Sequence, residues 1–355
     1  MSDSNKIIVG ISQGDLNGVG LETVIKTFSD PAMLDICTPV IFSGHKMFNT
    51  YKKQVGAEEF NVHFVKDNQG INHKRVNVVS FTEEDIQLEA GKINPAAGKF
   101  ALASIDAACE ALQNNTVDVL VTAPVDKNAI EAVSPGFKGH TEYLQAKLGA
   151  SDSLMILMSG DLRVGLVTGH LPLRDVANAV TKEKIEKKVK LMAKSLLEDF
   201  GIRKPKIAVL GLNPHAGDQG TLGKEELEII IPAIESLKSQ GVLAFGPYPA
   251  DGFFGSGNWK NFDGIMAMYH DQGLAPFKAV SFAAGVNYTA GLPFVRTSPD
   301  HGTATNIAFS GKADESSFRT ALYTAIDIYR QRVLWNEISA DPLKFQPRQK
   351  DYKER

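Results

Sequence analysis

Short apolar runs that alternate with segments of helical period restrict the fold of this chain most strongly. The first run, residues 7–11, is followed by a Gly-rich turn and then by Leu21, Val24, Ile25 and Phe28, which are spaced as on one face of a helix. Further apolar runs, each a candidate strand, occupy residues 39–43, 62–65, 76–79, 117–122, 153–158, 163–168, 206–210, 242–245 and 264–269. This alternation predicts an α/β fold with a largely parallel sheet.

Helix boundaries can be predicted at three further places. Pro95 can occupy the first turn of a helix, and Thr181 can cap another helix that Gly201 closes. The last predicted helix runs from about Ser317 to Leu334 and precedes a polar tail. Because the sequence contains neither an internal repeat nor a low-complexity linker, we expect two α/β lobes that share one continuous chain.

The composition excludes several classes of partner. The 355 residues carry a formal net charge of -3, so no overall field attracts nucleic acid or an anionic membrane, and an anionic ligand must be bound by local groups. No apolar stretch approaches the length of a membrane span, and the polar first residues do not read as an export signal. Cys37 and Cys109 lack partners at metal or redox spacing. We therefore expect a cytoplasmic enzyme with two inert thiols.

Three histidines occur in equivalent settings. His170, His215 and His270 each follow an apolar run, although 45 and 55 residues separate them along the chain. In open α/β sheets the carboxyl ends of strands meet at one edge, so the three imidazoles could converge on one divalent metal ion and leave a position open for substrate. Imidazole ligands suit Zn, Co, Ni or Fe. The alternative is three separate loop histidines, each bonded to backbone. Asp271 is either a partner of a metal-bound histidine or a turn residue.

A second group of residues supplies donors for an anion. Thr141 can also cap a helix that begins near Glu142, where free N–H groups attract phosphate or carboxylate; the alternative is an ordinary cap beside a surface histidine. Lys278 and Arg296 lie in apolar stretches, and a cation that closes a buried strand is costly unless it faces a cleft or an ion partner. The candidate anion-binding residues are His140, Thr141, Lys278, Asn287 and Arg296.

The loop at residues 298–306 is a candidate for dinucleotide binding. Gly302 permits close approach of the backbone, so the loop could receive the adenosine end of a dinucleotide, while His301 could equally act as a loop hydrogen-bond donor. A Rossmann fingerprint is absent, because Gly14, Gly18 and Gly20 have the wrong spacing. If a nicotinamide cofactor binds, another type of fold must hold it.

Six sequence motifs together resemble those of the 4-hydroxythreonine-4-phosphate dehydrogenase family of the pyridoxal phosphate pathway. The resemblance runs from the N-terminal strand to about residue 315. The motifs are Gly139-His-Thr-Glu, His170-Leu-Pro-Leu-Arg-Asp, Gly211-Leu-Asn-Pro-His-Ala-Gly, Pro249-Ala-Asp, Tyr269-His-Asp-Gln-Gly and Phe294-Val-Arg-Thr-Ser-Pro-Asp-His-Gly-Thr-Ala. The chain departs from the family at Gly14-Asp-Leu-Asn-Gly-Val-Gly-Leu, where two prolines are missing.

The resemblance implies an isocitrate/isopropylmalate-dehydrogenase-like fold, with two α/β/α lobes and a cleft between them. Residues 1–138 with 305–355 would form the first lobe and residues 139–304 the second. It also implies a homodimer whose active site is completed across the interface. Carried over by position, the metal ligands are His170, His215 and His270, the substrate-binding residues are His140, Thr141, Lys278, Asn287 and Arg296, and the NAD-binding residues are Asp300, His301, Gly302, Thr303 and Ala304.

The implied reaction is NAD- or NADP-dependent oxidation of 4-phosphohydroxy-L-threonine at its C3 hydroxyl, assisted by one divalent ion such as Zn, Mg or Co. The product, 2-amino-3-oxo-4-phosphooxybutanoate, decarboxylates to 3-amino-2-oxopropyl phosphate. Asp251 and Lys278 are candidate acid/base groups, although Asp251 could simply cap a turn. The alternatives are a dehydrogenase for D-threonate or D-erythronate 4-phosphate, and a non-catalytic protein that binds phosphorylated ligands.

Overall fold

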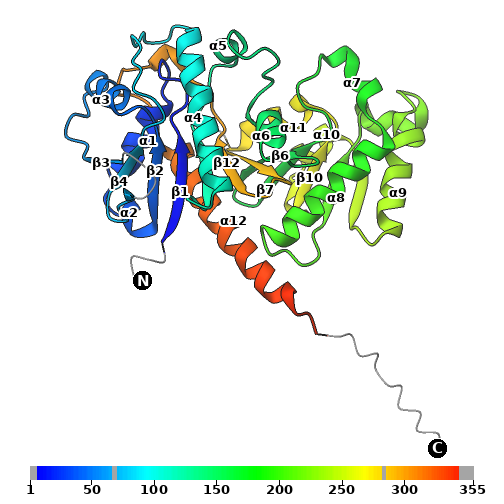
Figure 1. The fold of residues 1–355 in the computed structure, drawn as a ribbon. Helices are drawn as coiled ribbons and strands as arrows, with labels where there is room; N and C mark the ends of the chain where they lie inside the picture. The colour runs from blue at the N-terminus through cyan, green and yellow to red at the C-terminus, as the bar shows by residue number, and fades with distance from the viewer. Residues whose placement is uncertain (1–5, 66–69, 282–284, 344–355) are drawn as a thin grey trace, which may run out of the picture.

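Within the residues that the structure describes, one twelve-stranded sheet organises the fold (Figure 1). The computed structural model describes residues 6–65, 70–281 and 285–343. The strand order is β3-β4-β2-β1-β5-β12-β11-β6-β7-β10-β8-β9. The strands are β1 (Ile7–Ser12), β2 (Cys37–Phe42), β3 (Val62–Val65), β4 (Val76–Val79), β5 (Val119–Thr122), β6 (Leu154–Ser159), β7 (Leu162–Leu166), β8 (Ile207–Leu210), β9 (Ala244–Tyr248), β10 (Gly264–Ala267), β11 (Val286–Ala290) and β12 (Val295–Pro299).

The sheet is mixed, with antiparallel strands at its centre. β12 pairs in parallel with β5, whereas β11 runs antiparallel to both β12 and β6, and β6 runs antiparallel to β7. The strands on either side are parallel, from β3 to β5 on one flank and from β7 to β9 on the other. The prediction of a largely parallel sheet therefore holds for the flanks and is wrong for the centre.

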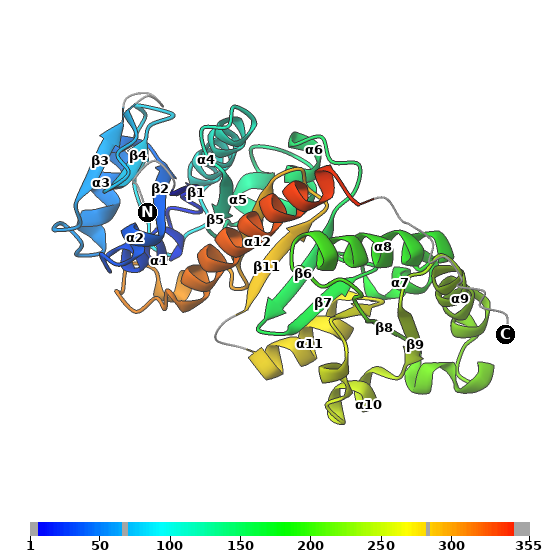
Figure 2. The same cartoon turned by 90° about the horizontal axis from the view of Figure 1, so that it is seen from below.

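Helices cover both faces of the sheet. One face buries apolar side chains of α1, α3, α8, α9 and α12, and the other buries those of α4, α6, α10 and α11. In Figure 2, α12 crosses the sheet beside β11 and approaches α8. The helices are α1 (Gly20–Phe28), α2 (Met33–Ile36), α3 (His45–Gln54), α4 (Pro95–Gln113), α5 (Lys127–Glu131), α6 (His140–Lys147), α7 (Leu173–Ala179), α8 (Lys182–Glu198), α9 (Ile231–Ser239), α10 (Ala250–Gly255), α11 (His270–Ser281) and α12 (Ser316–Ala340).

Local capping signals set several helix starts. The Thr181 hydroxyl accepts a hydrogen bond from the Lys184 amide and starts α8, which is worth about 1 kcal/mol. Pro95 is the first residue of α4, and the side chain of Asn94 caps that helix. Both starts agree with the sequence prediction.

One apolar segment is a helix and not a strand. Lys278 lies in α11, which continues through Pro276, and its side chain is half exposed. The expectation that Lys278 closes a buried strand is therefore wrong, because an apolar run of this length is compatible with either structure. Arg296, by contrast, lies inside β12 and is 1% exposed.

No helix within the described ranges is long and apolar enough to cross a membrane.

Candidate functional site

Four of the predicted anion-binding residues line one cavity of about 240 Å³. His140 and Thr141 reach it from the start of α6, Asn287 from β11 and Arg296 from β12. His170, which follows β7, lines the same cavity. Strands distant in sequence thus bring these side chains together, next to the antiparallel centre of the sheet. The fifth predicted residue, Lys278, lines an adjoining cavity instead.

Arg296 places a cation inside the protein without a carboxylate partner. Its guanidinium donates to the hydroxyl of Thr122 from Nε (3.1 Å) and Nη2 (2.5 Å), and to the hydroxyl of Thr289 from Nη1 (3.0 Å). Burial lowers the pKa of Arg296 to about 9, so the group is still protonated at neutral pH. Over the described part of the chain, no carboxylate oxygen lies within 4.0 Å of it. A buried charge of this kind is stabilised by an anionic ligand.

Three further polar atoms at this cavity have no hydrogen-bond partner among the residues that the structure describes. The atoms are His140 Nε2, Asn287 Oδ1 and His301 Nε2, and each is shielded from solvent. Burial, followed by the cations of Arg296 and Lys127, lowers the pKa of His140 well below its ordinary value, so its ring is neutral. Since buried polar groups are normally satisfied, the cavity is built for a polar, anionic ligand.

The start of α6 differs from the prediction. The helix begins at His140, and Gly139 precedes it with φ of 149°, a conformation that favours glycine. In the described part of the chain no side chain caps this helix, so the expectation that Thr141 caps a helix near Glu142 is wrong. Thr141 instead lies in the first turn, where it faces the cavity.

Two of the three predicted metal ligands lie side by side. The ring centroids of His170 and His270 are 5.8 Å apart. Nδ1 of His270 lies 2.7 Å from the Asp271 carboxylate, and Nδ1 of His170 lies 3.5 Å from Glu142, whose pKa the histidine lowers. Each carboxylate favours a proton on Nδ1 and leaves Nε2 available for a metal ion. This donor set fits a divalent ion that binds imidazole.

His215 follows β8 in a turn, residues 214–220, in which residues 215–219 have left-handed backbone. Within the described ranges, no three His, Cys, Asp or Glu side chains are placed to hold one metal ion, so His215 does not complete a group with His170 and His270. Asp251 is exposed in the first turn of α10 and lines neither of the two cavities described here.

The predicted dinucleotide loop separates the two cavities. The second cavity, of about 580 Å³, is lined by Asp300, His301, Gly302 and Ala304, and the first three also line the smaller cavity. Lys278 Nζ lies 3.7 Å from Asp300 Oδ1 at the wall of the larger one. The two cavities therefore adjoin through one loop, which suits a substrate that reacts with a cofactor.

The backbone of Thr303 contacts the N-terminal turn. Its carbonyl oxygen accepts a hydrogen bond from Val19 N (3.0 Å), and a Cβ on Gly18 would lie 2.8 Å from the same oxygen. The absence of a side chain at Gly18 therefore permits close contact with the predicted dinucleotide loop. Spacing alone had excluded a Rossmann turn here but gave no sign of this contact.

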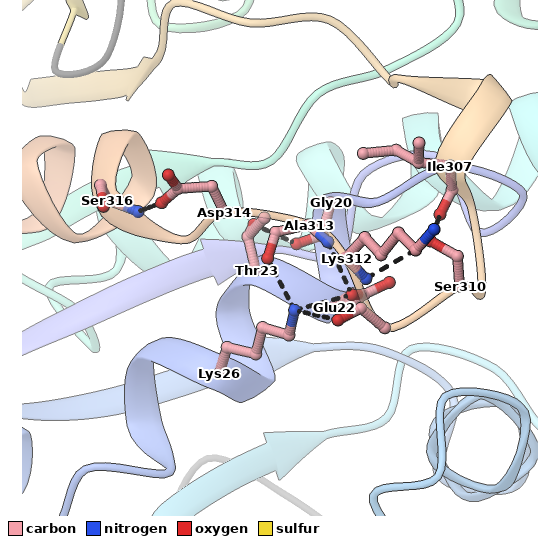
Figure 3. A network of polar contacts seen from close by, with 12 residues as sticks. Gly20, Glu22, Thr23, Lys26, Ile307, Ser310, Lys312, Ala313, Asp314 and Ser316 are labelled. Carbon is pink, nitrogen blue, oxygen red and sulfur yellow. Dashed lines mark hydrogen bonds and ion pairs between the residues drawn. The ribbon is translucent and has the colours of Figure 1, made fainter.

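An ion pair with a buried carboxylate supports Ala313, which lines the larger cavity (Figure 3). Glu22 and Lys26 of α1 form a 3.0 Å pair. Lys26 donates to the carbonyls of Gly311 and Ala313, and the Ala313 amide donates to Glu22. Sequence reasoning missed both charged residues, because an i,i+4 pair on a helix usually indicates only a solvated face.

Comparison with known proteins gives one consistent result. The sequence matches the family described as pyridoxal phosphate biosynthetic protein PdxA over residues 35–325. It is 50% identical over 345 residues to 4-hydroxythreonine-4-phosphate dehydrogenase of Bacteroides thetaiotaomicron, which covers 97% of this chain and 94% of the relative.

Two solved structures are similar over almost their full length. The 4-hydroxythreonine-4-phosphate dehydrogenase from Klebsiella pneumoniae aligns with a TM-score of 0.77 at 30% identity, covering 92% of this chain and 98% of the other. The corresponding enzyme from Burkholderia phymatum aligns with a TM-score of 0.73 at 34% identity, covering 91% and 98%.

Proposed function

Because this chain belongs to the PdxA family of pyridoxal phosphate biosynthetic proteins, we propose that it is an NAD(P)-dependent 4-hydroxythreonine-4-phosphate dehydrogenase. It oxidises the C3 hydroxyl of 4-phosphohydroxy-L-threonine to 2-amino-3-oxo-4-phosphooxybutanoate, which decarboxylates to 3-amino-2-oxopropyl phosphate. The observation that carries this proposal is the buried, carboxylate-free cation Arg296 in a cavity that adjoins a larger one.

The substrate's anionic groups bind in the smaller cavity. Arg296 attracts a phosphate or carboxylate, and its hydrogen bonds to Thr122 and Thr289 hold the guanidinium in place before the ligand arrives. Neutral His140 offers Nε2 as a donor or acceptor according to its tautomer, and Asn287 offers Oδ1 as an acceptor for a substrate hydroxyl or ammonium group. Thr141 contributes from the first turn of α6.

The larger cavity would hold the nicotinamide cofactor, which would accept the hydride from C3. Asp300, His301, Gly302 and Ala304 line this cavity and would contact the cofactor, and Thr303 holds the loop against the N-terminal turn. Lys278, at the wall of the larger cavity, lies beside Asp300, which lines both cavities, and balances the charge of this carboxylate, whose pKa burial raises. Its position suits a role with the substrate or as an acid/base group. Asp251 is an acid/base candidate only if another chain brings it to the cavity.

His170, His215 and His270 would hold one divalent ion, such as Zn, Mg or Co. When bound, such an ion would supply Lewis-acid chemistry, which lowers the pKa of a coordinated hydroxyl and polarises a carbonyl. Asp271 and Glu142 orient two of the rings so that Nε2 is available.

The site is completed in a homodimer. A pair of imidazoles from one chain leaves coordination positions for residues of a second copy. Two leucines close to His170 support a contact surface here, since Leu171 is 42% and Leu173 is 74% exposed. The two buried thiols, Cys37 and Cys109, are unpaired, which agrees with a cytoplasmic location.

For the mixed α/β sheet we propose an isocitrate/isopropylmalate-dehydrogenase-like fold. In this assignment residues 1–138 with 305–355 form one lobe and residues 139–304 the other. The strand order supports it, because β1 to β5 lie together on one flank and β6 to β10 on the other. Strand β12 lies between the two groups and pairs with β5.

The test is a spectrophotometric assay of the purified protein with 4-phosphohydroxy-L-threonine, NAD or NADP, and a panel of divalent ions. D-threonate and D-erythronate 4-phosphates are assayed in parallel. With 4-phosphohydroxy-L-threonine we expect the absorbance of the reduced cofactor to increase, and this increase should require the divalent ion. Turnover of only the threonate or erythronate phosphates would reassign the substrate. Binding of these phosphates without turnover of any of them would refute the proposed catalytic activity.

A further inference from the structure

The turn that carries His215 has an unusual backbone. Residues 215–219 are all left-handed, with φ between 42° and 81°, and only Gly217 among them is glycine. L-residues adopt this conformation as single positions, because Cβ approaches the following carbonyl oxygen. A run of five is strained and persists only if its surroundings hold it.

A buried carboxylate lies beneath this turn. Glu226 is 2% exposed and begins a π-helical turn, Glu226–Ile230, which leads into α9. Its Oε1 accepts hydrogen bonds from the backbone amides of Leu212 and Asn213, each at 2.7 Å, and its Oε2 accepts one from Asn213 Nδ2 at 2.9 Å. These bonds fix the two residues that lead into the turn.

The turn also closes directly onto this carboxylate. A Cβ at Gly217 would lie 2.5 Å from Glu226 Oε2, and a Cβ at Gly211 would lie 3.0 Å from Ala216. No cation of the described chain forms an ion pair with Glu226. Among the described residues, the hydrogen bonds to this buried carboxylate come from N–H groups of Leu212 and Asn213. A carboxylate bound by several such donors is a strong and directional anchor.

The same segment is tied to the strand end that carries His270. Gln272 accepts a hydrogen bond from the Met268 amide at 2.7 Å and donates one to the Gly211 carbonyl at 2.6 Å. The imidazole of His215 is itself exposed, so packing does not orient it. Its position follows from the backbone conformation of the turn.

From this geometry we infer that Glu226 is a positioning residue, which holds the left-handed turn and thereby places His215 for metal binding. The inference rests on the proposed role of His215 as a metal ligand. A π-helical turn at such a position is consistent with it, because these turns are frequent at functional sites.

The test compares Glu226→Gln with a matched control, Glu228→Gln. The first variant keeps the shape but turns an amide group toward the Asn213 amide, so two donors face each other. The second removes the same charge from an exposed position of the same π-helical turn. Metal affinity is measured by competition with a chelating dye, and the visible spectrum of bound Co²⁺ reports the ligand geometry.

We expect Glu226→Gln to bind Zn²⁺ about 10–100-fold more weakly and to alter the Co²⁺ spectrum, as changes beside metal ligands do. Glu228→Gln should match the wild type. Because glycine adopts the left-handed conformation freely, adding Gln219→Gly to Glu226→Gln should restore part of the affinity. If Glu226→Gln does not fold, Asn213→Ala carries the test, with a smaller loss expected.

Two measurements separate this inference from its alternatives. Parallel losses of NAD affinity and thermal stability in Glu226→Gln would show a merely structural role and overturn it. His215→Ala tests the ligand itself. If His215→Ala loses the metal and Glu226→Gln does not, the positioning role is wrong and the proposed function stands. If His215→Ala keeps full metal affinity, His215 is not a metal ligand, and the positioning role of Glu226 is refuted together with this assignment.

Discussion

Replacing Arg296 by methionine should separate function from stability. The substitution keeps a long, flexible side chain but removes a cation that is 1% exposed and has no carboxylate partner in the described chain. Two charge-assisted hydrogen bonds to an anionic ligand are worth roughly 1.5–3 kcal/mol each, so kcat/KM should fall about a hundredfold to ten-thousandfold. The free energy of unfolding should be unchanged or rise by about 1–4 kcal/mol, because a buried charge is removed.

Steady-state kinetics with 4-phosphohydroxy-L-threonine and urea unfolding of the ligand-free protein measure the two effects. The control is Arg330→Met, which removes an exposed cation of α12 far from the cavity and should change neither. If Arg296→Met lost several kcal/mol of stability and kept its kcat/KM, the arginine would be a structural cation. The anion-binding role would then be refuted.

Three more changes test separate parts of the account. Burial raises the pKa of Asp15 to about 6, so the folded protein holds this proton more tightly than the unfolded chain. Stability therefore falls as pH rises from about 4 to 6, and Asp15→Asn should be about 1–3 kcal/mol more stable than wild type at pH 7 in urea unfolding. Asp271→Asn should weaken metal binding about 10–100-fold in chelator competition, because the Nδ1 partner of His270 loses its charge. Lys26→Met should weaken NAD binding several-fold in a fluorescence titration, since it frees Ala313 at the cavity wall.

Each of these has a clear contrary result. An Asp15→Asn stability gain that is equal at pH 4 and pH 7 would mean that titration is not its cause. Unaltered metal affinity in Asp271→Asn would reduce this carboxylate to a turn residue. Unaltered NAD affinity in Lys26→Met would show that the larger cavity is not the cofactor site, or that the segment around Ala313 keeps its conformation without the hydrogen bond from Lys26.

Local periodicity predicted the elements whose signals are local. The runs at residues 62–65 and 76–79 match β3 and β4, and the cap at Thr181 is observed. The segment around Lys278 was predicted as a strand but is part of a helix, because a short apolar run is compatible with either structure. The antiparallel centre was missed because pairing of β11 with β6 depends on residues far apart in sequence.

The candidate site was visible mainly through the resemblance. Strand ends and apolar context singled out His170, Arg296 and the loop that follows β12, and the structure brings these around one cavity. Two carboxylates were not predicted in their supporting roles: Glu142 lies beside His170, and Glu226 binds the segment that leads into the His215 turn. Glu226 stands in the polar stretch Gly223-Lys-Glu-Glu, which reads as an exposed helix start, and only the fold reveals that it is buried.

The position of a bound metal ion decides whether His170, His215 and His270 form one metal site. Crystals grown with Zn²⁺ and measured by anomalous diffraction should show one peak per active site, about 2.0–2.1 Å from Nε2 of His170, His215 and His270, with one or more of these rings supplied by a second copy of the chain. A peak that contacts none of these rings, or their Nε2 atoms free in a fully active, metal-loaded enzyme, would contradict the account.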